Sequence, residues 1–142
     1  MTTATSLTTL LQQGKIIMAP GAPDALTARL VQKAGFPAVY MTGFGATASR
    51  LGTPDIGLLS QTEMTTHARD MARVVDIPII ADADTGYGGP LNVIRTVREF
   101  ERAGISGIQI EDQQWPKRCG HEPGRKIVST EEMVGRIKAA VD

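Results

Sequence analysis

Short apolar runs alternate with longer amphipathic segments along the chain, and this alternation limits the fold more than any other feature. We expect strands over residues 15–19, 38–42, 77–82 and 107–111. The third run ends in Asp82 and is apolar before it, as in a strand that is buried on both faces of a parallel sheet. Four strand–helix units in succession predict parallel strands joined by right-handed crossovers, and hence an α/β fold.

Signals for helices fall between these runs. We expect helices over residues 6–13, 24–34, 60–75 and 90–103, and from residue 129 onward. Two of them begin with the S-x-x-E pattern of a capping box, at Ser60 and at Ser129. Pro90 suits the first turn of its helix, where a missing N–H group costs nothing. We expect loops over residues 43–59 and 112–128.

Two architectures fit this order of elements. Length favours a flavodoxin-like or Rossmann sheet, because the chain has 142 residues and a TIM barrel typically needs about 250. The positions of the acids favour the barrel, which places its chemistry at the carboxyl ends of its strands. The acids at such positions are Asp82, Asp84, Glu111 and Asp112. With the motifs described below, we expect one domain over residues 1–142, formed by the first four strand–helix units of a (β/α)8 TIM barrel.

Charge and cysteine content restrict the partners and the compartment. Fifteen basic residues balance fifteen acidic ones, so no net field attracts nucleic acid or an anionic membrane. The single cysteine, Cys119, excludes an internal disulfide and is typical of a reducing compartment. No secretory signal pattern is present, and no apolar run approaches the roughly 20 residues of a membrane-spanning helix. We expect a cytoplasmic protein that binds neither nucleic acid nor a membrane.

A pair of acids, Asp82 and Asp84, follows the third expected strand. If the strand continues through both, their side chains share a face, and two adjacent carboxylates repel unless a cation lies between them. Such oxygen ligands suit Mg²⁺, with Mn²⁺ as the alternative ion. Glu111 could reach the same ion directly or through water, and Asp55 could act in the outer shell of the metal. The other interpretation is structural, in which these acids cap a helix, form a turn or pair with basic neighbours.

The sequence K-R-C-G-H at residues 117–121 places a thiol among cationic neighbours. Two cations and a histidine near Cys119 would lower the pKa of the thiol from roughly 8.5 toward neutrality, so that it exchanges protons near pH 7. Gly120 gives the loop freedom to close. An inert buried cysteine is the alternative, but this one lies in a long polar loop. One cysteine and one histidine are too few ligands for a structural zinc site.

Several other residues are given structural roles. His67 lies within an expected helix, as a surface or partly buried imidazole, and Trp115 is expected to pack on the cysteine-bearing loop. The methionines expected to fill the core are Met41, Met64, Met71 and Met133.

Four motifs together resemble the isocitrate lyase and phosphoenolpyruvate mutase superfamily in their order and spacing. They are M-T-G at residues 41–43, D-A-D-T-G at 82–86, E-D-Q at 111–113 and K-R-C-G-H at 117–121. The resemblance covers about residues 15–142. The K-R-C-G-H motif is similar to the lyase branch, which includes 2-methylisocitrate lyase and dimethylmalate lyase, whereas phosphonomutases carry a different loop.

The resemblance implies a role for individual residues. The implied catalytic residues are Cys119, as the acid, and Lys117, Arg118 and His121. The implied substrate-binding residues are Thr42, Gly43, Phe44, Cys119 and Gly120. The implied metal ligands are Asp82 and Asp84, with Asp55 and Glu111 in the outer shell.

These roles imply a Mg²⁺-dependent carbon–carbon lyase. It would cleave a 2-hydroxy di- or tricarboxylate, such as 2-methylisocitrate, to a 2-oxo acid such as pyruvate and a second carboxylic acid. It would act as a homo-oligomer, since barrels of the family associate as tetramers. The rival hypotheses are an oxaloacetate decarboxylase, an enzyme similar to carboxyphosphonoenolpyruvate phosphonomutase, and a non-catalytic half-barrel.

The sequence departs from the family pattern in two respects. Phe44 is bulkier than the small residue that some lyases have in the substrate-binding turn, which bears on the side group of the substrate. The later four strand–helix units are absent, and with them an arginine that holds substrate carboxylates in family members. We therefore expect a fragment or a truncated gene product, whose open sheet edges favour oligomers or poor solubility.

Overall fold

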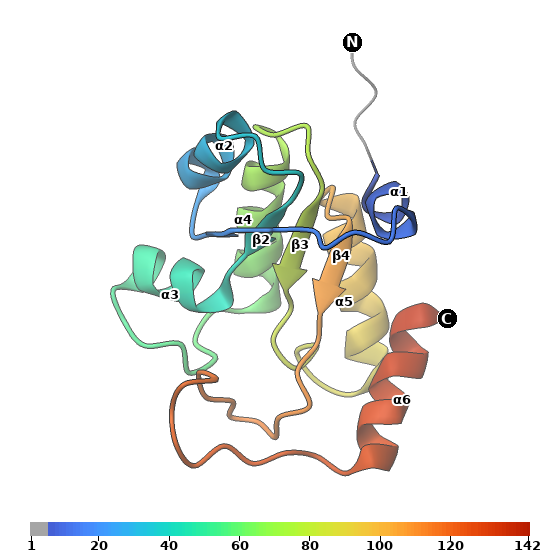
Figure 1. Ribbon diagram of the computed structural model, residues 1–142. Coiled ribbons are helices and arrows are strands. Elements are labelled where there is room, and N and C mark those ends of the chain that lie inside the picture. The colour runs from blue at the N-terminus through green and yellow to red at the C-terminus, as the bar shows by residue number, and fades with distance from the viewer. Residues whose placement is uncertain (1–5) are drawn as a thin grey trace.

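The computed structural model describes residues 6–142, which form a parallel four-stranded sheet with helices along one face (Figure 1). The strands are β1 (Gly21–Ala22), β2 (Val39–Met41), β3 (Ile79–Asp82) and β4 (Gly107–Gln109). Neighbouring strands follow chain order, β1-β2-β3-β4, and every pair is parallel. A doubly wound sheet reverses its strand order at a switch point. The observed order is that of a barrel wall, so the expected α/β fold is confirmed, and the sheet is consistent with part of a TIM barrel.

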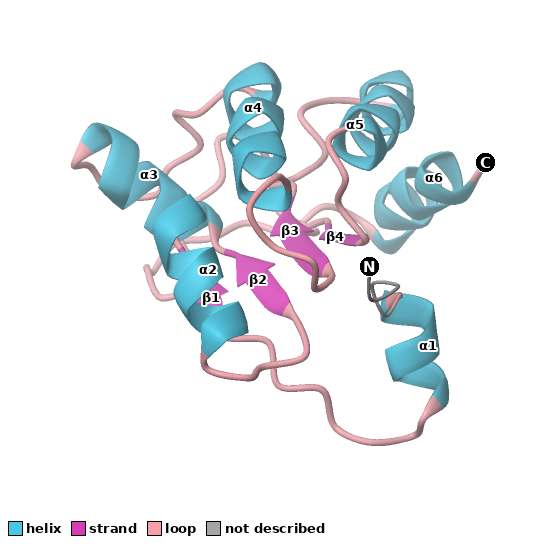
Figure 2. Cartoon of the chain, turned by 90° about the horizontal axis from the view of Figure 1, so that it is seen from above, coloured by secondary structure: helices cyan, strands magenta, loops and turns pink. Residues whose placement is uncertain are grey.

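The helices lie mainly outside this wall. In the described residues they are α1 (Leu7–Gln12), α2 (Ala25–Lys33), α3 (Gly43–Leu51), α4 (Gln61–Ala72), α5 (Pro90–Arg102) and α6 (Thr130–Val141). Seen along the strands, α2, α4, α5 and α6 form an arc on one side of the sheet, and α1 lies apart from them (Figure 2). None of these helices is long and apolar enough to cross a membrane.

The core fills the space between the sheet and this arc of helices. Successive strand residues face opposite sides of a sheet, and Met41 of β2 and Ala81 of β3 point to the core, where both are fully buried. Phe100 of α5 and Met64 and Met71 of α4 pack with them. The burial of these methionines confirms their expected role, whereas Met133 is only half-buried.

Residues on the opposite face of the strands include polar side chains. Asp82 of β3 pairs in register with Gln109 of β4, and Tyr40 of β2 is opposite Ile80. The Tyr40 hydroxyl lies 3.0 Å from Gln109 Oε1 and donates a hydrogen bond to it. Strand alternation therefore separates the apolar core from the face that carries Asp82.

Local capping explains where two of the helices begin. Ser60 Oγ accepts a hydrogen bond from the Glu63 N–H group, and Glu63 Oε2 accepts one from Ser60 N at 2.7 Å, which completes the capping box of α4. Ser129 Oγ accepts from Glu132 N at 3.2 Å at the start of α6. The S-x-x-E patterns therefore identified both helix starts correctly.

The expected first strand is wrong. Residues 15–19 contain no strand, and the first strand is β1, which lies after Pro20. Ile16 is 99% exposed and Met18 is 63% exposed, so their apolar character does not reflect burial in the described chain. Pairing with β2 begins only where Tyr40 N donates to Pro20 O, at 3.0 Å.

The expectation of an unbroken loop over residues 43–59 is also wrong, because α3 occupies the first part of it. Thr42 caps this helix, with its hydroxyl accepting from Gly45 N at 3.1 Å. Glycine disfavours a helix interior by about 0.5–1 kcal/mol relative to alanine. A side chain at Gly45 would lie 2.5 Å from Thr42 Cγ2, so this glycine permits close packing and does not mark a loop.

His67 has the structural role that the sequence indicated. Its ring is half-buried, and Nε2 lies 2.8 Å from Pro23 O.

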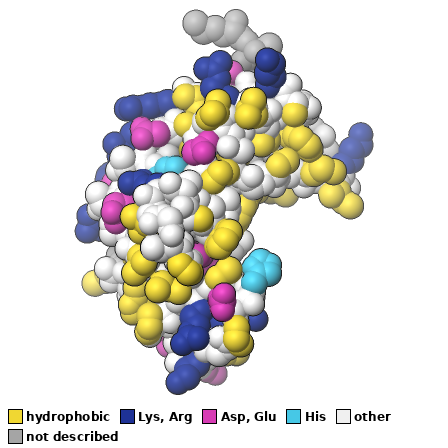
Figure 3. All heavy atoms as spheres, turned by 90° about the vertical axis from the view of Figure 1, so that its left-hand side faces the viewer, with side chains coloured by type: hydrophobic (Ala, Val, Ile, Leu, Met, Phe, Trp, Pro, Cys, Tyr) yellow, Lys and Arg dark blue, Asp and Glu magenta, His cyan; other side chains and the backbone are white. Residues whose placement is uncertain are grey.

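The face of the molecule shown in Figure 3 fits the balanced charge, since basic, acidic and hydrophobic side chains are mixed on it.

Phe100→Ala should destabilise the fold strongly. Phe100 is 0% exposed, so loss of the ring should lower the free energy of unfolding by about 3–5 kcal/mol. Leu91, on the same helix, is 82% exposed, and Leu91→Ala should change it by less than about 0.5 kcal/mol. Urea unfolding followed by circular dichroism measures both. Equal effects of the two substitutions would contradict the packing described.

Candidate metal and catalytic site

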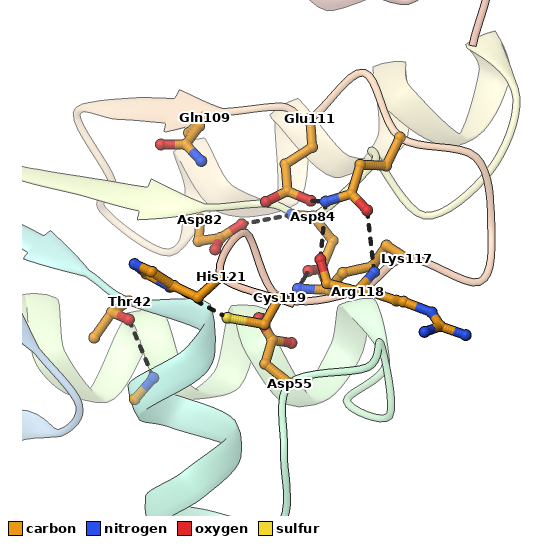
Figure 4. Close-up of polar contacts among 12 residues, drawn as sticks. Thr42, Asp55, Asp82, Asp84, Gln109, Glu111, Lys117, Arg118, Cys119 and His121 are labelled. Carbon is orange, nitrogen blue, oxygen red and sulfur yellow. Dashed lines mark hydrogen bonds and ion pairs between the residues drawn. The ribbon is translucent and has the colours of Figure 1, made fainter. Parts of the chain in front are cut away.

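Three buried aspartates meet at the carboxyl end of the sheet (Figure 4). Asp82 ends β3, Asp84 follows it, and Asp55 comes from the Asp55 loop, residues 52–60 between α3 and α4. Each offers a carboxylate oxygen, and the three oxygens lie within 4.8 Å of one another. The sequence indicated Asp82 and Asp84 as the direct pair and Asp55 as an outer member. In the structure Asp55 belongs to the same group of oxygens as the other two.

A turn, and not the strand itself, brings Asp84 to Asp82. The strand ends at Asp82, as expected, so the condition under which both side chains would share a strand face is not met. Asp84 has a φ of 48°, in the left-handed region that few residues other than glycine adopt. Its N–H group donates to Asp82 Oδ1 at 2.9 Å. The side chain of Asp82 therefore stabilises the turn that positions Asp84.

Glycine at position 43 permits α3 to approach this cluster. A Cβ atom on Gly43 would lie 2.5 Å from Asp82 Oδ2, so any side chain there would displace the carboxylate or the helix. Gly43 is the first residue of α3, after the cap Thr42. The amino-terminal end of a helix favours negative charge, so this end suits both the acid beside it and an anionic ligand.

Lys117 supplies a cation within the cluster. Its side chain is 0% exposed, and Nζ lies 2.6 Å from Asp55 Oδ2 and 2.5 Å from Asp84 Oδ1. The contact with Asp55 is a hydrogen bond. The contact with Asp84 Oδ1 is an ion pair whose geometry falls outside that of an ordinary hydrogen bond. Lys117 thus contacts two of the three acids.

The charges of the cluster fit a divalent cation. When ionised, three carboxylates and one ammonium leave two negative charges, which a divalent cation would neutralise. All the donor atoms are carboxylate oxygens, the ligands that hard cations such as Mg²⁺ prefer. The three acids can therefore hold a divalent metal.

Burial and mutual repulsion shift the ionisation of these groups. Burial raises the pKa of Asp82 and raises that of Asp84 to about 6, while the Lys117 ammonium opposes both shifts. Burial alone would lower the pKa of Lys117, but the carboxylates of Asp84 and Asp55 raise it above its usual range. Lys117 therefore stays charged at neutral pH. Its single positive charge does not balance the three carboxylates.

Cys119 lies in the cysteine loop (residues 112–128), which passes over the carboxyl ends of the strands (Figure 1). Its Sγ lies 3.6 Å from His121 Nδ1. Lys117 is instead directed at the acids, and Arg118, whose Nη1 lies 3.4 Å from Pro123 O, points away from Cys119 (Figure 4). Of the three cationic neighbours expected around the thiol, the structure brings only His121 into contact with it. Consecutive residues of an extended loop project in different directions, which explains the difference.

Glu111 lies beside the cluster, as expected, but is not one of its three close members. It is half-buried, and its Oε2 accepts from Gln113 Nε2 at 2.8 Å. Burial raises its pKa, and the nearby Lys117 opposes this shift. The role of Glu111 in the outer shell of a metal stays a prediction.

Gln113 and Arg136 hold the start of the cysteine loop. Sequence reasoning assigned neither residue a role, although Gln113 lies in the E-D-Q motif. Gln113 Oε1 accepts from Arg118 N at 3.1 Å, and its Nε2 donates to Arg118 O at 2.9 Å. Arg136 of α6 donates from Nη1 to Glu111 O and to Gln113 O, both at 3.2 Å. Arg136 and Ala139 are both buried on α6, three residues apart. A charged residue on the inward face of a helix was the signal that could have found it.

The expected substrate-binding residues lie on two elements. Thr42 and Gly43 form the amino-terminal end of α3, and Phe44, in its first turn, is 54% exposed. Gly120 is in the cysteine loop, where a Cβ atom would lie 3.7 Å from Arg125 Nη1. The structure thus places Gly43 against Asp82, while the binding of a substrate by these residues stays a prediction.

Parallel strands in chain order, with buried acids at their carboxyl ends, define a protein of the α/β barrel class. The family model described as phosphoenolpyruvate phosphomutase matches residues 7–142. The chain therefore belongs to this family, within the phosphoenolpyruvate mutase and isocitrate lyase superfamily, and the resemblance found in the motifs is confirmed.

Curated relatives and solved structures agree with this assignment. The chain is 57% identical to 2,3-dimethylmalate lyase of Eubacterium barkeri over all of its own length and 49% of that protein. It is 47% identical to 2-methylisocitrate lyase of Halalkalibacterium halodurans, over 92% of this chain and 43% of that protein. A structure of oxaloacetate acetylhydrolase with 3,3-difluorooxalacetate is 46% identical, with a TM-score of 0.92 over 97% of this chain and 48% of the other. The chain thus spans about half the length of the proteins it matches.

Lys117→Met should destabilise the fold in a way that magnesium reverses. Loss of the buried ammonium that pairs with Asp55 and Asp84 should lower the free energy of unfolding by about 3–5 kcal/mol. Added MgCl₂ should restore more stability to the variant than to the unmodified protein. Urea unfolding with and without MgCl₂ measures this.

A matched control is Arg102→Met, which removes a surface ion pair with Glu99 of 2.8 Å. It should cost less than about 1 kcal/mol and show no extra response to magnesium. If MgCl₂ stabilised Lys117→Met and Arg102→Met equally, the acids would not be the metal site.

Proposed function

We propose that the full-length protein containing this chain is a Mg²⁺-dependent carbon–carbon lyase. It cleaves a 2-hydroxy di- or tricarboxylate of the 2,3-dimethylmalate or 2-methylisocitrate type into a 2-oxo acid and a second carboxylic acid. The observation that carries the proposal is the buried group of Asp55, Asp82 and Asp84 beneath a loop that bears a free thiol. Identities of 57% and 47% to lyases with these substrates support the same reaction class.

Within this proposal, the three aspartates hold the metal. When bound, the ion supplies Lewis-acid polarisation of the substrate hydroxyl and the adjacent carboxylate. Lys117 keeps the carboxylates of Asp55 and Asp84 together and offsets part of their repulsion. Glu111 faces the cluster from the end of β4 and orders water around it (Figure 4).

Cys119 is the proton donor in the proposed reaction. Cleavage needs two proton transfers: the substrate hydroxyl loses a proton to solvent through a base as the carbonyl group forms, and the departing carbon receives one from the thiol, which regains a proton from solvent after product release. His121 Nδ1, 3.6 Å from Sγ, stabilises the thiolate that this transfer leaves. Water would react with the departing carbon while it carries charge, so the cysteine loop must also exclude water.

The amino-terminal end of α3 binds a carboxylate of the substrate. Free N–H groups at the start of a helix and the helix dipole both favour an anion, and Gly43 brings this end against Asp82. Phe44 follows directly and is largely exposed, so its ring limits the size of the substrate side group.

Hydrolysis of oxaloacetate is the second candidate function. The similarity to oxaloacetate acetylhydrolase, at a TM-score of 0.92, supports it. Both reactions break a carbon–carbon bond of a small carboxylate, so the same acids would serve either. Release of 2-oxo acid from 2,3-dimethylmalate or 2-methylisocitrate, compared with consumption of oxaloacetate, separates the two.

Cys119→Ser should abolish most of the turnover and leave metal binding intact. Loss of a positioned acid should lower kcat by about 10²- to 10⁴-fold, while Mg²⁺ affinity measured by calorimetry should not change. Asp82→Asn should weaken Mg²⁺ binding as well as turnover, because it removes a ligand oxygen.

The assay uses the full-length protein with 2,3-dimethylmalate and 2-methylisocitrate, and pyruvate release is followed. Undiminished cleavage by Cys119→Ser would remove the thiol from the mechanism. Unchanged Mg²⁺ affinity in Asp82→Asn would exclude the acids as the metal site.

A further inference from the structure

The start of the cysteine loop is a closed unit. The side-chain amide of Gln113 bonds to both the N–H and the C=O group of Arg118, so residues 113–118 form a ring held at both ends. Gln113 is 6% exposed, which shields these bonds from water. Arg136 fixes the same unit to α6 through Gln113 O. Residues 113–118 therefore move as one body.

Two side chains of this unit reach the Asp55 loop. Lys117 pairs with Asp55, and the indole of Trp115 rests on Gly57, two residues further along the loop. In Figure 1 the orange and red segment of the cysteine loop meets the green segment between α3 and α4. The position of the unit relative to the Asp55 loop thus depends on an ion pair and on one aromatic contact.

Gly57 is suited to receive the ring. Its φ is +75°, and a Cβ atom there would lie 2.5 Å from Trp115 Cη2 and 2.9 Å from Cζ3. The indole therefore packs directly on backbone where any other residue would place a side chain. Gly52, at the other end of the same loop, has a φ of +65°, and a Cβ atom there would meet nothing within 4 Å. Of these two glycines, only Gly57 combines the left-handed conformation with a close contact.

The contact is not ordinary core packing. Trp115 remains 57% exposed, and it borders a cavity of about 800 Å³ that also touches Tyr87 and Arg136. The acids do not line this cavity. Much of the ring is therefore open, and Gly57 supports the part that is covered.

We propose that Trp115 is a positioning residue, which holds Cys119 over the three acids through its contact with Gly57. Cys119 directly follows the closed unit, so a shift of that unit displaces the thiol by a similar amount. Displacement of about 1 Å can reduce a rate by about 10²-fold. The inference rests on the proposed function for its effect on catalysis, but the contact itself can be tested without turnover.

The test compares Gly57→Ala with Gly52→Ala in the full-length protein. Both substitutions place alanine in the left-handed region, so both carry similar backbone strain. Only Gly57→Ala pushes the indole from its position. Cys119 is the only cysteine and Trp115 the only tryptophan of residues 1–142. Where the full-length protein contains others, mass spectrometry of the peptide bearing Cys119 gives its own rate of alkylation by iodoacetamide.

Gly57→Ala should alkylate several-fold faster at Cys119 than Gly52→Ala. Its kcat should fall by about 10- to 100-fold, with a smaller change in KM, because α3 and the metal site are not altered. Acrylamide should also quench the Trp115 fluorescence more strongly. Gly52→Ala should match the unmodified protein in all of these measurements.

Equal alkylation rates in the two glycine variants would overturn the inference, and so would an equal loss of kcat. Trp115→Ala carries the same comparison by alkylation if Gly57→Ala does not fold. If the unmodified protein shows no lyase activity, the proposed function fails, and the alkylation rates alone still decide whether Trp115 holds Cys119 in place.

Discussion

A buried ammonium among three carboxylates joins three segments that are distant in the sequence. Lys117 comes from the cysteine loop, Asp55 from the loop after α3, and Asp84 from the turn after β3. Taking each charge out of water costs several kcal/mol, which is offset only where the geometry is close and hydrogen bonds are made. The segments are therefore held in one arrangement, because separating them would leave a buried charge without its partner.

This cluster also explains why the backbone around it is unusual. Asp84 adopts a left-handed conformation, and Gly43 leaves no room for a side chain beside Asp82. Both features allow elements that carry charge to lie close together, and a strained residue such as Asp84 persists where the surrounding structure determines its conformation. The carboxyl end of the sheet is thus organised by electrostatics, while the face of the strands toward the helices is organised by apolar packing around residues such as Phe100.

Sequence reasoning succeeded where structure depends on near neighbours. The starts of α4 and α6 followed from Ser60 and Ser129, because capping joins residues three apart. It failed where distant contacts decide. The segment 15–19 is apolar but pairs with no strand among residues 6–142, whereas the two residues of β1 are recognised only through their pairing with β2. The glycines of α3 suggested a loop, because the reason for Gly43 is a carboxylate that comes 39 positions later in the chain.

For the candidate site, the sequence predicted which residues take part but not the direction in which each side chain points. Motifs named the residues, because the types of side chain that hold metals or donate protons are few. They did not give the direction of Lys117, which turns from the thiol to the acids, since that depends on the path of the cysteine loop through space. One sequence motif therefore serves two tasks. Lys117 anchors the loop to the acids, and Cys119, two residues later, is left free at the edge of the same cluster, where its thiol meets His121.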